Sequence, residues 1–340
     1  MVSTKPGPLI FISSDSSPSL DEVILNYELS NRAEGKSPKT IGWYNDMLQM
    51  YSRYCKEQFE EYDISGLNID NARAYVNYLR HRRRFKDHPF LQEQTQPLSP
   101  KTIQCHVRVL KAFSTWMYQE EYSEENTLKN LKLPKAPTKV IEPLSPEEIK
   151  KVSDSINIKS STGIRNRTIL STMLDTGLRA SEVANITLAN LNLNDGYIKV
   201  MGKGAKERLV PIGKYVQGTL WHYIDTIRPD PIGSNHNNLF LSHSGKRVTV
   251  NTIKLVFSRM AKSSGVTRLH AHLCRHTFAI NYLLNGGDIF SLKNILGHST
   301  LEMVNHYLHF TSSQITKQHQ LYSPMDKLTS EISNRQQDNK

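Results

Sequence analysis

Residues 271–278, AHLCRHTF, place two imidazoles and a guanidinium within five positions of an otherwise apolar segment. If this segment is a helix, His272 and Arg275 share one face, because they are three residues apart. A guanidinium offers a planar fork of donors to phosphate oxygens, so this face could bind an anion. A metal site made of His270, His272 and His276 is disfavoured, since no carboxylate or cysteine completes an obvious set of ligands. We expect His276 to be buried and hydrogen-bonded.

A second segment, TGLRASEVANI, combines a glycine, an arginine and a glutamate at helical spacing. Gly177 breaks the preceding helical pattern, and Arg179 stands at the start of the next helix. Glu182 follows three residues later on the same helical face and could clamp the guanidinium. An arginine at a helix start is common, so this segment alone does not define a site.

Two further segments each contribute polar residues that packing does not require. In MGKGAKERLV, Lys203 lies between glycines at the tip of an expected hairpin. In LGHSTLEMVNHY, His298 follows a glycine and Tyr307 comes nine positions later. Each residue is a weak signal by itself, since Tyr307 is one of 15 tyrosines. The order of all these residues along the chain is the specific feature.

The elements that would position these residues fall into two regions. A length of 340 residues favours two domains. A proline-rich stretch divides the chain, and after it Ser145 and Glu148 have the spacing of a helix-capping box. Further on, GYIKVMGKGAKERLVPI predicts two short strands joined at a Gly-Lys-Gly turn. The expected order is a disordered leader (1–18), a helical domain (19–135), a linker (136–144), a second domain (145–328) and a disordered tail (329–340).

The pentapeptide SPKTI occurs twice, at residues 37–41 and 99–103. In each copy the serine can cap a helix and the proline can be its first residue. A helix N-terminus that bears lysine and threonine also suits a phosphate. The basic run RHRRRFK at 80–86 could add phosphate contacts, although a solvated charge run is the alternative. The candidate DNA-binding residues are Lys39, Thr40, Lys101, Thr102, Arg82 and Arg83.

The composition agrees with a nucleic-acid partner. Lysine and arginine outnumber aspartate and glutamate by 43 to 32, which gives a formal net charge of +11, and such an excess attracts polyanions. The sequence has neither an apolar run of membrane-spanning length nor a signal peptide, so we expect a cytoplasmic protein without membrane contact. Cys55, Cys105 and Cys274 are far apart, so we expect buried thiols rather than disulfides or zinc ligands.

The strings TGLRASE, GKGAKERLVPI, HLCRHTFA and LGHSTLEMVNHYLH together resemble the tyrosine site-specific recombinases, the family of phage integrases and Xer recombinases. The resemblance covers almost the whole chain. It implies a mainly α fold with a small β-sheet, in which a helical, SAM-like core-binding domain and an α+β catalytic domain form a C-shaped clamp around DNA. It also implies an enzyme that cuts and rejoins DNA in integration, excision or dimer resolution.

The resemblance assigns six catalytic residues: Arg179, Lys203, His272, Arg275, His298 and Tyr307. By this resemblance the two arginines clamp the non-bridging oxygens of the phosphate, and His298 donates to the same oxygens. Preorganised donors at these positions would stabilise the charge of the five-coordinate transition state. Glu182 would orient Arg179. No metal ion and no cofactor is implied.

The other three residues would carry the proton transfers. Tyr307 would attack phosphorus and form a covalent 3′-phosphotyrosine, with His272 as its proton acceptor and Lys203 as the acid that protonates the leaving 5′-oxygen. Leu273 and Cys274 depart from the family's usual residues, and we expect this to affect local packing only. Around the nucleophile, EMVNHY replaces a run that is commonly rich in threonine.

The implied partners are double-stranded DNA with a specific site and further copies of the chain in a homo-tetramer, with a second recombinase as the alternative partner. In this tetramer a terminal helix at 312–328 would pack on a neighbouring subunit. Base recognition would be spread over the SPKTI helices and a helix near VTVNTIKLVFSRM. The alternatives are a type IB topoisomerase, which would religate the original strand, a catalytically silent DNA-binding regulator, and, less favoured, a metal-dependent nuclease.

Overall fold

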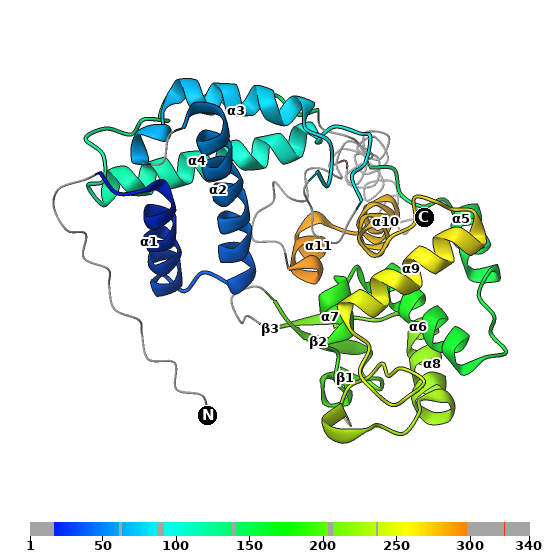
Figure 1. Ribbon diagram of the computed structural model, residues 1–340. Coiled ribbons are helices and arrows are strands. Elements are labelled where there is room, and N and C mark those ends of the chain that lie inside the picture. Colours follow the sequence, from blue (N-terminus) through cyan, green and yellow to red (C-terminus); the bar gives the residue numbers. More distant parts are fainter. Residues whose placement is uncertain are drawn as a thin grey trace, which may run out of the picture. The chain divides into compact units, whose positions relative to one another are not determined.

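The computed structural model describes residues 17–60, 63–86, 92–137, 141–202, 207–235, 237–297 and 323. The chain divides into two compact units, residues 1–139 and 140–340, and each is described by itself (Figure 1). In the described residues, no helix has the length and apolar character needed to cross a membrane.

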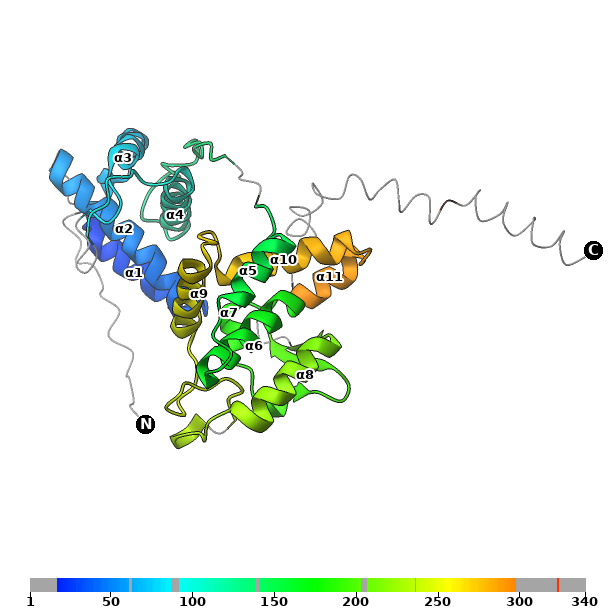
Figure 2. The same ribbon diagram turned by 90° about the vertical axis from the view of Figure 1, so that its right-hand side faces the viewer.

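Unit 1 is helical in the part that the structure describes. Its helices are α1 (Leu20–Ala33), α2 (Pro38–Phe59), α3 (Ile69–His81) and α4 (Pro100–Gln119). Figure 1 shows α1 beside α2 and α3 beside α4, and Figure 2 shows the same two pairs from the side. Both SPKTI copies begin helices as predicted, because the hydroxyls of Ser37 and Ser99 accept the backbone N–H groups of Thr40 and Thr102.

Aromatic side chains fill much of the core of unit 1. Tyr27 packs against Phe113 and Trp116, with ring centroids 5.2 and 5.0 Å apart. His106 is buried at 4% exposure, and its Nδ1 lies 3.2 Å from the hydroxyl of Tyr75. Burial, together with the charge of Arg82, lowers the pKa of His106 to about 4. This imidazole is therefore neutral at pH 7.

Unit 2 combines helices with one small sheet. Its helices are α5 (Pro146–Asp154), α6 (Ser161–Thr176), α7 (Ala180–Ala184), α8 (Lys214–His222), α9 (Val250–Ser264), α10 (Ala271–Leu284) and α11 (Ile289–Leu296). The strands β1 (Leu191–Asn192), β2 (Tyr197–Met201) and β3 (Glu207–Pro211) form an antiparallel sheet in the order β1-β2-β3. The predicted capping box of Ser145 and Glu148 opens α5. The predicted hairpin is confirmed, since Met201 pairs with Glu207.

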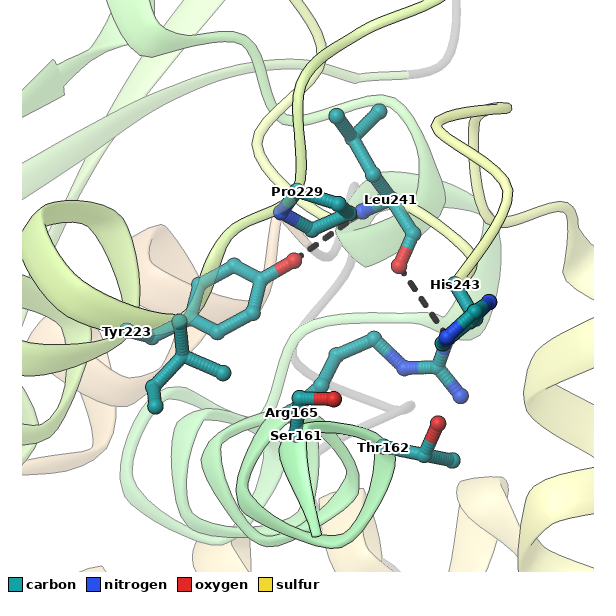
Figure 3. Close-up of a pocket in the computed structure, with 8 residues that line it drawn as sticks. Ser161, Thr162, Arg165, Tyr223, Pro229, Leu241 and His243 are labelled. Atoms are coloured by element: carbon teal, nitrogen blue, oxygen red, sulfur yellow. Dashed lines mark hydrogen bonds between the residues drawn. The ribbon is translucent and has the colours of Figure 1, made fainter.

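One buried arginine of unit 2 has a structural role. Arg165 of α6 is 7% exposed and lines a cavity of about 160 Å³. Its Nη1 donates to the carbonyl of Leu241 at 3.1 Å, while the N–H of Leu241 donates to the Tyr223 hydroxyl (Figure 3). Its Nε and Nη2 donate to Asn166. These bonds fasten the segment at 241 to α6.

Candidate active site

The turn between α6 and α7 carries the first predicted arginine. α6 ends at Gly177, which adopts a left-handed conformation with φ +62°. A Cβ at this position would lie 2.5 Å from Phe278 of α10 and 2.7 Å from Leu296 of α11, so the packing requires glycine. Arg179 is the N-cap residue of α7. The turn is therefore fixed against α10 and α11 two residues before Arg179.

Glu182 clamps Arg179 as predicted. Its Oε1 accepts from Nη1 of Arg179 at 3.0 Å, and its Oε2 accepts from the backbone N–H of Arg179 at 2.8 Å. The side chain of Arg179 remains 35% exposed, whereas that of Glu182 is 6% exposed. The carboxylate thus lies beneath the guanidinium and restricts its orientation.

A second arginine, Arg208 of β3, also binds Glu182. Its Nη1 and Nη2 donate to the two carboxylate oxygens at 2.9 and 3.0 Å. Burial by itself would raise the pKa of Glu182, but the hydrogen bonds from Arg208 and from the backbone of Arg179, with both positive charges, outweigh it and hold the pKa below its usual range. Glu182 is therefore ionised at neutral pH.

Sequence reasoning did not single out Arg208. Its Nε donates to the carbonyl of Ile295 in the last turn of α11 at 2.8 Å. The available signal was strand alternation: Arg208 shares a face of β3 with the buried Val210, whereas Leu209 on the opposite face is exposed. A charged residue on the inner face of a strand needs partners there.

Arg275 is brought to the same turn from α10. It is 1% exposed, and it donates from Nη1 to the carbonyl of Gly177 and from Nη2 to the carbonyl of Leu296, both at 2.8 Å. Gly177 is two residues from Arg179, so the structure brings the two predicted arginines to one turn. The deep burial of Arg275 was not foreseen from the sequence.

His272 lies one turn before Arg275 on α10 and is exposed. Partial desolvation lowers its pKa, and the positive charges of Arg275, His270 and Arg179 lower it further. The influence of both arginines places His272 in the same cationic region. Its imidazole is neutral at pH 7 and can accept a proton.

The neighbouring residues of α10 fit the predicted packing only in part. His276 is half-buried rather than fully buried, and its ring meets that of His272 edge-on with centroids 4.6 Å apart. Leu273 and Cys274 are buried in the core of unit 2. Among the described residues, no group of three or more histidine, cysteine, aspartate or glutamate side chains could hold a metal ion.

Three predicted catalytic residues, Lys203, His298 and Tyr307, lie outside the described residues, as does all but one residue of the predicted terminal helix at 312–328. Their flanking positions are described in two cases. Lys203 belongs to the connection between the paired residues Met201 and Glu207. His298 directly follows Gly297, which caps α11 in a left-handed conformation with φ +64°.

The candidate DNA-binding residues of unit 1 differ in exposure. Lys39, Lys101 and Arg83 are exposed, whereas Thr40 and Thr102 are half-buried and hydrogen-bond to the capping serines. Arg82 is 9% exposed. Its guanidinium lies over the ring of Tyr78, donates to the Tyr78 hydroxyl and donates to the carbonyl of Lys86 at 2.8 Å. These contacts give Arg82 a structural role inside unit 1, which the sequence did not indicate.

Comparisons with known proteins define the class. Residues 142–314 match the phage integrase family. Over 293 residues the chain is 31% identical to tyrosine recombinase XerD of Staphylococcus aureus, covering 86% of this chain and 94% of XerD. The chain therefore belongs to the phage integrase family. It is a tyrosine recombinase, an enzyme of site-specific DNA recombination that cuts and rejoins DNA strands.

Further relatives agree with this assignment. Tyrosine recombinase XerC of Staphylococcus saprophyticus is 28% identical over 283 residues, covering 83% of this chain and 90% of XerC. Among solved structures, the Tn1549 transposon integrase in complex with transposon right end DNA aligns with a TM-score of 0.69 at 19% identity, covering 90% of this chain and 100% of that one. A lambda integrase dimer bound to a core site aligns with a TM-score of 0.64 at 16% identity, covering 84% and 97%. The predicted mainly helical fold with a small sheet is confirmed, and the topoisomerase and regulator alternatives are not favoured.

Proposed function

We propose that Arg179, Arg275 and His272 form the described part of the active site, and that Lys203, His298 and Tyr307 complete it. The observation that carries this proposal is the bond from Arg275 to the carbonyl of Gly177, two residues from Arg179. It fixes the Arg275 guanidinium against the turn that leads into Arg179, where the scissile phosphate would bind. Because Arg275 is 1% exposed in this structure, we expect the binding of DNA to uncover one edge of its guanidinium.

In the proposed reaction the phenolic oxygen of Tyr307 attacks phosphorus. The bond from phosphorus to the tyrosine oxygen forms while the bond to the 5′-oxygen breaks, which leaves a 3′-phosphotyrosine and a 5′-hydroxyl. His272, neutral at pH 7 because of its lowered pKa, accepts the phenolic proton. Lys203 protonates the departing oxygen. A 5′-hydroxyl from another strand then reverses these steps, so the reaction needs neither a nucleotide nor a metal ion.

The proposal extends to the partners and the domains. Residues 19–135 would be the core-binding domain and 145–328 the catalytic domain, with Lys39, Lys101 and Arg83 as exposed candidates for phosphate contact. Two of the relatives were solved on DNA, which supports double-stranded DNA as the partner. Exchange of two duplexes through a four-way junction requires four active sites, hence a tetramer. We place this reaction in the cytoplasm.

A covalent trap tests the assignment of the nucleophile. Cells that produce the chain are lysed in detergent, protein-linked DNA is recovered, and the attached DNA is sequenced. We expect one recurrent sequence joined to the parent chain through its 3′ end and no adduct with Tyr307→Phe. An adduct that persists in Tyr307→Phe would overturn the assignment, and DNA cleavage that leaves no adduct and stops when a chelator is present would favour the metal-dependent nuclease.

A further inference from the structure

We infer that Arg208 is a positioning residue for DNA cleavage, which acts on Arg179 through Glu182 and also holds the chain that leads into His298. The inference rests on the proposed active site. It assigns to a residue of β3 a part in catalysis that requires no contact with the DNA.

The first step concerns the hydrogen bonds around Glu182. Each carboxylate oxygen accepts two donors, one from each arginine: Oε1 binds the Nη1 atoms of Arg179 and Arg208, and Oε2 binds the backbone N–H of Arg179 and Nη2 of Arg208. The bidentate bond from Arg208 fixes the plane of the carboxylate. Because Nη1 of Arg179 binds this fixed carboxylate, the orientation of the Arg179 guanidinium depends on Arg208.

The second step concerns charge. Glu182 alone would neutralise Arg179, which would weaken its attraction for a phosphate. With Arg208 present, two positive charges face one negative charge, so the group keeps a net charge of +1. The side chains of Arg208 and Glu182 are 12% and 6% exposed, whereas that of Arg179 is 35% exposed. The buried Arg208 therefore balances the negative charge of Glu182, and the positive charge of the more exposed Arg179 remains available to a ligand.

The third step concerns the segments that Arg208 joins. Its Nε binds the carbonyl of Ile295, and a Cβ at Gly297 would lie 3.1 Å from its guanidinium. Gly297 is followed directly by His298. Arg208 also lies one residue after Glu207, which closes the connection that contains Lys203. A single side chain thus contacts α7 and the end of α11 from the strand that follows Lys203.

Lysine cannot replace this arginine. An ammonium carries the same charge but lacks the planar fork that reaches both oxygens of Glu182 and the carbonyl of Ile295 at once. Arg208→Lys therefore keeps the positive charge but removes the planar set of donors. Arg208→Met removes both the charge and the donors, and it preserves most of the side-chain volume.

The test uses the full chain and the DNA sequence recovered by covalent trapping, with either a normal phosphodiester or a methylphosphonate at the cleaved position. The methylphosphonate has no negative charge at the phosphorus, so its cleavage depends less on guanidinium groups. Strand cleavage is measured in a single turnover for the parent, Arg208→Lys, Arg208→Met, Arg179→Ala and a matched control, Arg167→Met. Arg167 is a half-buried arginine of α6 that binds the hydroxyl of Tyr215 and lies outside the proposed site.

For the phosphodiester we expect both Arg208 variants to cleave on the order of 10²-fold more slowly than the parent, as when one preorganised donor is lost, with unchanged DNA affinity and with Arg167→Met at the parent rate. On the methylphosphonate the deficit of the Arg208 variants should shrink to a few-fold, as for Arg179→Ala. The inference would be overturned if the Arg208 variants lost the same factor in cleavage rate on both substrates, or if the loss in rate of each variant simply tracked the decrease in its melting temperature. Either result would show a merely structural role. A parent chain that forms no adduct, or an Arg179→Ala variant that cleaves both substrates normally, would instead refute the proposed active site.

Discussion

The substitution Glu182→Gln probes how far the carboxylate supports the local structure of unit 2. Four donors converge on the two carboxylate oxygens of Glu182. An amide keeps one oxygen and turns the other into a donor, so two of the four hydrogen bonds are lost. Each hydrogen bond to a charged group contributes about 1.5–3 kcal/mol, and breaking a buried ion pair costs about 3–5 kcal/mol. We therefore expect a local loss of at least about 3 kcal/mol.

Hydrogen exchange measures this loss where it occurs. At about 1.4 kcal/mol for each factor of ten, amides of β3 and α7 should exchange on the order of 10²-fold faster in Glu182→Gln. The matched control is Glu148→Gln, since Glu148 binds Arg268 in a pair whose side chains are 27% and 39% exposed, and such a pair contributes about 0–1 kcal/mol. If exchange in β3 and α7 is the same in both variants, Glu182 does not hold these elements together.

Two further predictions concern pH. The pKa of His106 is about 4 in the folded chain and about 6.5 when unfolded. Between these two pH values only the unfolded chain binds the proton. The free energy of unfolding of unit 1 should therefore decrease by about 1.4 kcal/mol for each unit by which the pH is lowered, roughly 3 kcal/mol in all. Urea unfolding of a Trp221→Phe background, followed by the fluorescence of Trp43 and Trp116 in unit 1, checks this. A slope that survives in His106→Gln would contradict it. The pKa of His272 is lowered, so the cleavage rate should rise with pH along a limb whose midpoint lies below the ordinary histidine pKa. His272→Gln should lack this limb and cleave roughly 10²-fold more slowly. A limb of the parent chain with its midpoint at or above about 6.5 would contradict the role of His272 as base.

Features set by neighbouring residues could be predicted from the sequence. The helix starts at Ser37 and Ser99 follow from the capping preference of serine, and the pairing of Met201 with Glu207 follows from the glycines between the two strands. The bond between Arg179 and Glu182 follows from their separation of three residues. In each case the partners are a few positions apart, so the local backbone geometry determines the contact.

Contacts between distant parts of the chain could not be predicted in this way. Arg208 and Glu182 are 26 positions apart, and nothing in either segment specifies the other. Arg82 belongs to a run of basic residues that is typical of a solvated surface, yet it folds back over Tyr78. The burial of Arg275 depends on two carbonyls that are 98 and 21 positions away. The residue type of Arg275 predicted that it could bind a phosphate, but its environment is determined by the packing of α6, α10 and α11.

The way in which these arginines are anchored explains how the site can stay positively charged. The last carbonyls of a helix have no partner within it and carry the negative end of the helix dipole. Arg275 and Arg208 bind such carbonyls at the end of α11, and Arg275 also binds the carbonyl of the residue that caps α6. A carbonyl carries only a partial charge, so it fixes a guanidinium without cancelling its charge as a carboxylate would. The one carboxylate described at the site, Glu182, is offset by Arg208. Together these arrangements hold Arg179 and Arg275 in place and preserve the positive field that a phosphate in the transition state would require.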